Sequence, residues 1–259
     1  MNKTNNTDRF EDIKDITEHQ ISRRTILSLS FFFVCFGLGC AFFFWLFTQK
    51  QGDDNIQPAL RKSHEFNDRL FSSLFSKSKT AKEYKPEEAV PKPRVNGKVG
   101  MEGILDTNTW RLKLVRAAGD TQYITLNELK SLPKTDVIYD FKCVEGWSEL
   151  THWGGVRFAD FIKKYNLNMQ ATRQYVGLIT PDSTYYVGID IASMLQPQTI
   201  LCYEMNGKPL PQDQGYPLRL IIPVKYGIKH LKRIGLMYFS DSKPRDYWAE
   251  RGYDYYSGL

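Results

Sequence analysis

The fold is decided by the stretch Phe141-Lys142-Cys143-Val144-Glu145-Gly146-Trp147-Ser148. The apolar residues before it predict a strand from Val137 to Val144 that runs into a turn. A thiol at the end of a strand, followed by Gly146, can project into a cleft. The neighbouring Lys142 favours the thiolate form of Cys143, which is the form that binds a soft metal. The residues alone also fit an inert core cysteine, so both interpretations stay open at this point.

A second informative region lies between residues 206 and 232. It reads Asn206-Gly-Lys-Pro-Leu-Pro, then Gly215-Tyr-Pro-Leu-Arg-Leu, then Lys225-Tyr-Gly-Ile-Lys-His-Leu-Lys. Turns set by glycine and proline can expose backbone N–H groups, and cations beside them can bind a phosphate. The cations here are Arg219, Lys225, Lys229, His230 and Lys232. We therefore predict a site for an anionic ligand, against the alternative of β-turns with solvated lysines.

Together the two regions resemble the sulfite-oxidase-fold molybdopterin oxidoreductases, above all the bacterial branch that contains the catalytic subunits of periplasmic methionine-sulfoxide reductases. The resemblance runs from about Arg94 to the C-terminus. Besides the stretches already quoted, it is carried by Trp153 with Gly155-Val156, by Tyr247-Trp248 and by Gly252-Tyr253-Asp254. It implies a molybdopterin-dependent enzyme with an α+β fold, a sulfite-oxidase-type domain of mixed sheets and short helices.

The resemblance also implies roles for individual residues. Cys143 is expected to be the catalytic residue and the thiolate ligand of the molybdenum. Arg219 matches the arginine that holds the pterin phosphate, and Gln214 stands where the family often has His or Asn. The other residues expected at the cofactor are Asn96, Thr180, His230, Leu231 and Lys232. Further candidates for lining the pocket are Lys142, Trp147, His152 and Tyr226, with His152 equally suited to a structural hydrogen bond.

The expected reaction is the transfer of an oxygen atom, with sulfoxide reduction as the nearest analogy within the family. The chain has no CxxCH haem motif, so electrons are expected to pass through a membrane haem protein or a quinone-linked subunit. The dimerisation domain of sulfite oxidases does not follow before Leu259, which argues against sulfite as the substrate.

Two alternatives remain from the residues. The domain could be a metal-free binding or assembly module of a membrane complex, although a binding module has no need of a metal-ligating thiol. Cys143 could instead form a structural disulfide with Cys202, the second cysteine of the soluble domain.

Short apolar segments alternate from Arg94 onward. Strands are predicted at Trp110–Arg116, Val137–Val144, Tyr175–Thr180, Ile200–Glu204, Leu218–Ile222 and Ile234–Phe239. Helices are predicted at Leu126–Leu132, opened by Thr125, and at Val156–Tyr165. Asn206-Gly207 is a strong hairpin signal. Many short strands with few helices indicate a mixed α+β domain and not a regular parallel βαβ array.

The N-terminal part predicts a membrane anchor. No charged residue occurs from Thr25 to Gln49, and the apolar stretch 26–47 is long enough for a helix to cross a hydrocarbon core of about 30 Å. Arg23 and Arg24 precede it, so the positive-inside rule puts the N-terminus in the cytoplasm. We expect a single-pass protein of a bacterial inner membrane with a periplasmic catalytic domain. The predicted organisation is a cytoplasmic tail (1–24), an anchor (25–49), a linker (50–93) and the molybdopterin-binding domain (94–259).

The residues Ser22-Arg23-Arg24-Thr25-Ile26-Leu27 resemble a twin-arginine export signal, although Ile26 and Ser28 stand where Phe and Lys are commoner. The alternative is a pair of ordinary anchoring arginines. Because the cofactor is inserted in the cytoplasm, an exported holoenzyme needs a route for folded cargo, which favours the export signal. No small-x-small cleavage site follows the span, so we expect it to stay as an anchor.

Within the linker, Leu60, Phe66, Leu70, Phe71, Leu74 and Phe75 recur at spacings near three and four. This pattern predicts a short amphipathic helix. We expect it to pack on the domain core, with the membrane surface as the alternative.

The charge does not indicate nucleic-acid binding. The net charge is +6 and the isoelectric point is near 9.0, but Lys and Arg are spread along the chain. Aromatic residues make up 14% of the chain, so a packed core is expected.

Overall fold

The computed structural model describes residues 17–50, 56–74, 80–95, 97–103, 105–106 and 108–259. The chain divides into two compact units. One contains residues 1–52 and 57–59, and the other contains residues 53–56 and 60–259.

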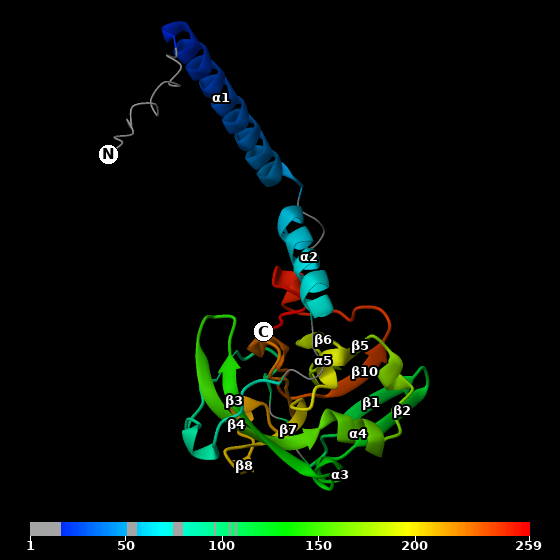
Figure 1. Cartoon of the computed structure of the whole chain (residues 1–259). Coiled ribbons are helices and arrows are strands. Elements are labelled where there is room, and N and C mark those ends of the chain that lie inside the picture. The colour runs from blue at the N-terminus through cyan, green and yellow to red at the C-terminus, as the bar shows by residue number, and fades with distance from the viewer. Residues whose placement is uncertain (1–16, 51–55, 75–79, 96, 104, 107) are drawn as a thin grey trace, which may run out of the picture. The chain divides into compact units, whose positions relative to one another are not determined.

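The first unit is built on the helix α1 (Glu18–Thr48), which is 31 residues long and has no buried residue (Figure 1). The side chain of Gln20 accepts a hydrogen bond from the backbone N–H of Thr17 at 3.3 Å, so the helix begins before the apolar stretch itself. The mean hydropathy of its most apolar window is 2.3. By length and composition α1 can cross a membrane, and it contains the whole of the predicted span 26–47.

The second unit contains two five-stranded sheets. The first sheet has the order β2-β1-β10-β5-β6, in which only β1 and β10 run parallel. Its strands are β1 (Leu112–Ala117), β2 (Asp120–Ile124), β5 (Tyr175–Ile179), β6 (Tyr186–Asp190) and β10 (Leu236–Ser240).

The second sheet is antiparallel throughout, with the order β3-β4-β7-β8 and with β9 paired to β7. Its strands are β3 (Lys134–Lys142), β4 (Ser148–Arg157), β7 (Ile200–Met205), β8 (Lys208–Pro209) and β9 (Arg219–Ile221). The short helices of the domain are α3 (Leu126–Lys130), α4 (Phe158–Lys164) and α5 (Ile191–Met194). Single turns of 3-10 helix form at η1 (Pro86–Glu88), η2 (Gln170–Thr172), η3 (Gln212–Gln214), η4 (Gly227–Lys229) and η5 (Ala249–Arg251).

The two faces of the second sheet have different partners. Because successive strand residues point to opposite faces, Leu201 and Leu220 join the main core, which also contains residues of the first sheet. Their neighbours Cys202 and Ile221 belong to a smaller cluster on the other face. Arg219 pairs with Cys202 across β7 and β9, so it also lies on the side of the smaller cluster.

The predicted α+β class is confirmed, and each predicted strand overlaps an observed one. The predicted helix Val156–Tyr165 is wrong at its start, because Val156 belongs to β4, where it pairs with Lys134 and with Leu201. The strands β2, β4 and β6 were not predicted, and β8 was indicated only by the hairpin signal at Asn206-Gly207.

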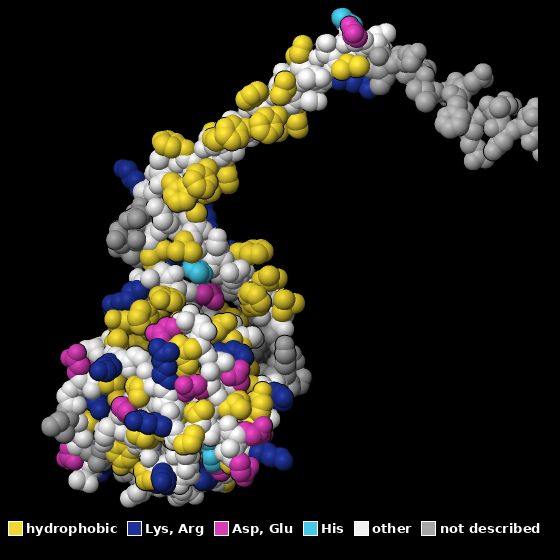
Figure 2. All heavy atoms as spheres, turned by 90° about the vertical axis from the view of Figure 1, so that its left-hand side faces the viewer, with side chains coloured by type: hydrophobic (Ala, Val, Ile, Leu, Met, Phe, Trp, Pro, Cys, Tyr) yellow, Lys and Arg dark blue, Asp and Glu magenta, His cyan; other side chains and the backbone are white. Residues whose placement is uncertain are grey.

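The linker forms the predicted amphipathic helix as α2 (Pro58–Leu74). Its expected packing into the core is wrong. Apolar side chains of α2 stay exposed, among them Phe66 at 62% and Leu74 at 69%. Figure 2 shows hydrophobic side chains along both α1 and α2.

Candidate active site

Cys143 lies in a tight turn directly after β3. Its backbone N–H donates to the carbonyl of Trp147 at 2.9 Å, and the N–H of Gly146 donates to the carbonyl of Cys143 at 3.1 Å. Gly146 has a φ of +86°, a left-handed conformation that glycine adopts without a steric penalty. The turn closes the β3–β4 hairpin, and the Cys143 side chain is 6% exposed.

The expected effect of Lys142 on this thiol is wrong. Lys142 and Cys143 are successive residues and point to opposite sides, and the Lys142 ammonium binds the Asp140 carboxylate at 2.7 Å. Burial raises the pKa of Cys143 above its ordinary value, and the charge of Arg94 acts more weakly in the other direction. The thiol is therefore protonated at neutral pH in the protein alone.

Cys143 lines a cavity together with residues from four other parts of the chain. Two of the predicted cofactor residues, His230 and Lys232, border the same cavity. The remaining lining residues are Gly97, Val99, Val144, Glu145, Tyr185, Gly227, Ile228, Trp248 and Tyr253.

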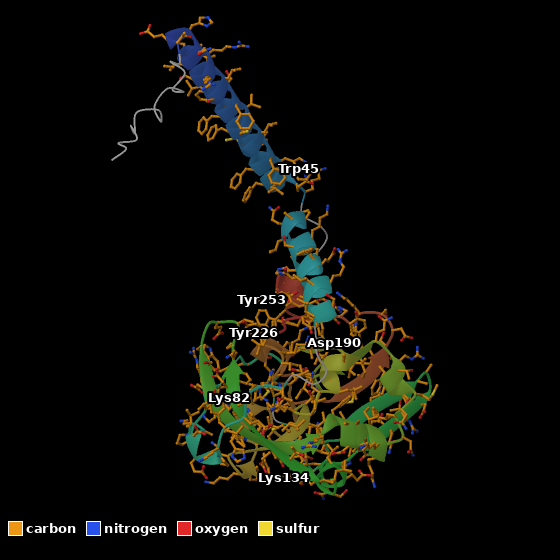
Figure 3. All side chains as sticks on the ribbon, viewed as in Figure 1. Trp45, Lys82, Lys134, Asp190, Tyr226 and Tyr253 are labelled. Atoms are coloured by element: carbon orange, nitrogen blue, oxygen red, sulfur yellow. The ribbon has the colours of Figure 1, made fainter. Side chains whose placement is uncertain are left out.

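Three aromatic residues of this cavity had no role assigned from the sequence. Trp248 and Tyr253 belong to the closing motifs of the resemblance, which was the only signal for them. Tyr185 stands outside every motif, and its hydroxyl donates to the carbonyl of Ile228 at 2.6 Å. Tyr226, which was a candidate, is not among the lining residues. Tyr226 and Tyr253 both lie at the end of the domain that α2 meets (Figure 3).

Arg219 is fully buried and has no anionic partner among the described residues. Its Nη1 donates to the carbonyl and to the side-chain Oε1 of Gln214, at 3.0 and 2.9 Å. Its Nε and Nη2 are buried without a hydrogen bond. The guanidinium stacks over the ring of Trp153 at 4.5 Å. Burial lowers the pKa of Arg219 to about 10, and an arginine kept charged in such a place needs an anion.

Gln214 connects Arg219 to the N-terminal edge of the domain. Its amide nitrogen donates to the carbonyls of Pro93 and Arg94 at 3.2 and 3.4 Å. The ammonium of Lys232 donates to the carbonyl of Gly97 at 3.1 Å. Asn96 itself lies outside the described residues, but the chain on both sides of it is held by two of the predicted cofactor residues.

Lys232 and His230 carry strongly shifted pKa values. Lys232 is 4% exposed and also donates to the carbonyl of Asp213 at 2.9 Å. Burial, and then the charge of Arg219, lower the pKa of Lys232 to about 7. The same two causes lower the pKa of His230 to about 3, so its ring is neutral at physiological pH.

The ring of His230 connects β3, the strand that leads to Cys143, with the loop between β9 and β10. Its Nε2 lies 3.1 Å from the carbonyl of Lys225, and its ring packs edge-on against Phe141 with centroids 4.9 Å apart. Leu231, in contrast, is fully buried in the main core. Its carbonyl accepts from the backbone N–H of Leu220 at 2.9 Å, which fixes the loop beside β9.

Thr180 is buried but is not among the cavity residues. Its hydroxyl donates to Asp182 at 2.5 Å and accepts from the backbone N–H of Tyr185 at 3.1 Å. It thus holds the turn that carries Tyr185, which does line the cavity. His152 is also away from the cavity, because its Nε2 binds Asp136 at 2.9 Å, the structural alternative expected for it.

Both cysteines of the domain are free thiols in the structure. The alternative of a disulfide between Cys143 and Cys202 is therefore not what the structure contains. In the described part of the chain, no three His, Cys, Asp or Glu side chains gather in a way that could hold a metal ion. A metal held through Cys143 would need its remaining ligands from elsewhere, as in an organic cofactor.

The donor set fits an anionic cofactor that is held through sulfur. A buried guanidinium with two unpaired nitrogens can bind a phosphate by a charge-assisted fork. Arg219 does not line the cavity itself, but the buried Lys232 does, and Cys143 supplies a soft ligand on its wall.

The family pattern described as "Oxidoreductase molybdopterin binding domain" matches residues 98–248. The chain belongs to this family. It is thus a molybdopterin-dependent oxidoreductase, and its cofactor is molybdenum–pterin.

Relatives agree with this assignment. A protein of Azospira oryzae, which carries the name of a protein-methionine-sulfoxide reductase subunit, YedZ1, is 34% identical over 209 residues, 80% of this chain and 78% of that protein. The protein-methionine-sulfoxide reductase catalytic subunit MsrP of Xanthomonas campestris pv. campestris is 32% identical over 56% of this chain and 49% of its own length. Mitochondrial sulfite oxidase of Rattus norvegicus is 28% identical over 59% of this chain and 33% of its own length. The chain thus spans about half of the MsrP protein and a third of the sulfite oxidase.

Proposed function

We propose that this chain is a membrane-anchored, extracytoplasmic oxidoreductase that transfers an oxygen atom, with sulfoxides as its substrate class. The proposal rests on Arg219, a fully buried cation whose Nε and Nη2 have no partner in the protein. A domain that bound no anion would have no reason to bury this charge. This argues against the metal-free binding module.

Different residues in and near the cavity would hold different parts of the cofactor. Arg219, with Lys232 beside the cavity, would bind the phosphate of the pterin, and the loop 230–232 would wrap around it. The thiolate of Cys143 would bind the molybdenum, which replaces the proton that burial otherwise keeps on the sulfur. When bound, the cofactor supplies a metal that exchanges an oxygen atom with a substrate and changes its oxidation state by two electrons.

Other residues would act by shaping the site. Burial and the charge of Arg219 keep His230 neutral, and the carbonyl of Lys225 holds its ring in place, so His230 would add no charge next to the phosphate. Tyr185, Trp248 and Tyr253 would exclude water from the metal's surroundings by their bulk. Thr180, Gln214 and the segment around Asn96 would hold the rim of the pterin.

The anchor completes the proposal. The helix α1 supports a single membrane span at 26–47 by its length and hydropathy. We propose the organisation expected from the sequence, with residues 1–24 in the cytoplasm, 25–49 in the membrane, 50–93 as a linker and 94–259 in the periplasm. Export through the twin-arginine route, signalled by Arg23 and Arg24, would deliver the folded holoenzyme.

Electrons would come from a membrane haem protein or a quinone-linked subunit, because the sequence contains no CxxCH motif for a haem of its own. Sulfoxides are favoured as substrates because two of the relatives carry the name of protein-methionine-sulfoxide reductase. Reduced viologen dye, oxidised only when methionine sulfoxide is added, would report this activity. Activity with sulfite and ferricyanide in its place would overturn the substrate assignment and leave the cofactor site standing.

The cofactor site is tested by molybdenum content. The full chain, purified in detergent from a host that makes the cofactor, is expected to hold close to one molybdenum per chain by elemental analysis. Cys143→Ser should lose the metal or change its Mo(V) resonance, because serine replaces a soft ligand by a hard one. Cys202→Ser is the matched control and should keep the metal and an unchanged Mo(V) resonance. A folded parent protein without molybdenum would refute the proposal and leave the metal-free module.

A further inference from the structure

The helix α2 contacts the domain with its polar side. Arg61 and His64 bind backbone carbonyls of the segment 249–256, at 3.2 and 3.0 Å. Asp68 accepts from a backbone N–H of the same segment at 2.9 Å and pairs with the ammonium of Lys243 at 2.6 Å. These contacts tie one face of α2 to the C-terminal part of the domain through four polar interactions.

The apolar side of α2 is largely uncovered, and only its Phe71 and Leu74 border a groove of the domain. At 3.6 residues per turn, it lies roughly a third of a turn away from the three contacting residues. Its members are 40–69% exposed: Leu60, Phe66, Leu70, Phe71 and Leu74. An amphipathic helix on a soluble domain normally turns this face toward the core. Here the arrangement is reversed, and a contiguous stripe of large apolar side chains faces outward, which marks an interaction surface.

The place of α2 in the chain indicates what covers this stripe. Nine residues separate the end of α1 at Thr48 from the start of α2 at Pro58. A chain of that length, fully extended, spans at most about 35 Å. If α1 crosses the bilayer, α2 is held near the membrane surface, where an amphipathic helix with this division of residues lies in the headgroup region.

We propose that α2 is an interfacial membrane helix that inserts its apolar stripe into the lipid headgroup and acyl boundary while its polar side carries the catalytic domain. This inference rests on the membrane span of the proposed function. It adds a second membrane contact, which is made by the domain unit itself.

The contact has a consequence for the active site. The segment 249–256 is hydrogen-bonded to α2. It contains Tyr253, a residue that lines the cavity of Cys143. The lipid contact therefore fixes the cavity-bearing end of the domain toward the bilayer. Electrons from a membrane partner would then have a short path to the site.

Photocrosslinking in lipid tests this proposal on the full-length holoenzyme. The photoreactive residue p-benzoylphenylalanine replaces Phe66 or Phe71 singly, and the protein is reconstituted into phosphatidylethanolamine–phosphatidylglycerol vesicles. Tyr123 on β2 is the matched control, because its exposure of 61% equals that of Phe66 within a percent. Phe36, within α1, reports the span itself. Lipid adducts are counted by mass spectrometry after illumination.

We expect lipid adducts at positions 36, 66 and 71 and at least about tenfold fewer at 123, because only the first three touch lipid. Adducts at 36 without adducts at 66 and 71 would overturn the interfacial helix and leave the anchor intact. Equal yields at 66 and 123, or crosslinks from 66 to a second protein, would also overturn it. A lack of adducts at 36 would refute the span of the proposed function and this inference with it.

Discussion

The Nη1 of Arg219 donates to both oxygens of Gln214, to the backbone carbonyl at 3.0 Å and to the side-chain amide oxygen at 2.9 Å. A single nitrogen thus makes both bonds, and the other two guanidinium nitrogens remain buried and unpaired. Because Gln214 is neutral, it orients the guanidinium without cancelling its charge. We propose that this arrangement preorganises the guanidinium for the phosphate of the pterin.

The first prediction concerns Arg219→Met. Without cofactor, the variant is expected to gain about 1–3 kcal/mol in the free energy of unfolding, because a buried charge without a partner is replaced by an apolar side chain. In a host that makes the cofactor, its molybdenum content should fall at least about tenfold, since a charge-assisted contact is lost. Urea unfolding and elemental analysis measure the two effects. Arg219→Lys keeps the charge but not the forked guanidinium. Its molybdenum content should lie between those of the parent and of Arg219→Met. Full molybdenum content in Arg219→Met would contradict the assignment.

The second prediction is a pH dependence that arises from Lys232. Its pKa is about 7 in the folded protein and about 10.4 in an unfolded chain. Between these values the unfolded chain holds a proton that the folded protein lacks, so this group makes the protein without cofactor more stable as the pH rises above 7. The slope is at most about 1.4 kcal/mol per pH unit. Below pH 7 the contribution is flat.

Urea unfolding of the parent and of Lys232→Met at pH values from about 6 to 9 isolates this contribution. The buried Lys225, whose pKa is lowered to about 8 by burial, acts in the same direction in both proteins and cancels in the difference. The parent should gain stability relative to the variant as the pH rises. Parallel curves would show that the pKa of Lys232 is not lowered in the folded protein. Bound cofactor should flatten the slope, because a phosphate retains the proton on the ammonium.

Much of the fold followed from local pattern. Runs of apolar residues bounded by turn residues located β3, β5, β7 and β10, because each of these strands is buried on at least one face. The strand β4 escaped notice because Gly154-Gly155 interrupts its pattern. Its place is set by pairing along its whole length with β3, a long-range effect that no window of sequence contains.

The site was predictable in its parts and not in its assembly. The turn at Cys143 and the loop at His230 and Lys232 were identified separately, and only the tertiary fold brings them to one cavity. Within the described part of the chain, Arg219 has no anionic partner because its neighbour in the fold is Gln214, which is neutral, and the sequence alone does not show this neighbour. The expectation for Lys142 failed because adjacency in sequence was taken for contact, whereas a strand sends successive side chains to opposite faces.

The orientation of α2 could not be predicted for a similar reason. Periodicity identifies which face is apolar, and it does not identify which face docks. The docking is decided by Asp68 and by its partners near the C-terminus, which lie far away in the sequence.

The third prediction separates the two thiols of the domain. In folded protein without cofactor, Cys143 should react slowly with iodoacetamide at neutral pH and faster as the pH rises, because burial raises its pKa but leaves it on a cavity wall. Cys202 should stay unreactive, because it is fully buried and its pKa is raised to about 12. Bound cofactor should protect Cys143. Peptide mass mapping after alkylation identifies each site, and finding the two sulfurs joined in freshly made protein would restore the disulfide alternative.

The fourth prediction concerns the close approach of β4 and β7 behind the site. A Cβ on Gly155 would collide with the backbone carbonyl of Leu201 and lie 2.7 Å from the Cα of Cys202. Gly155→Ala should therefore lower the free energy of unfolding by about 3 kcal/mol or more, because backbone must move. The adjacent Gly154→Ala is the matched control. Its Cβ would meet side-chain atoms at 3.1 Å, which can shift, so a loss of about 1 kcal/mol or less is expected. Because Cys202 pairs with Arg219, Gly155→Ala should also lower the molybdenum content of whatever protein still folds. Urea unfolding of the two variants decides the matter, since a loss as small in Gly155→Ala as in the control, about 1 kcal/mol or less, would mean that the β4–β7 contact tolerates a methyl group and does not hold Arg219 in place.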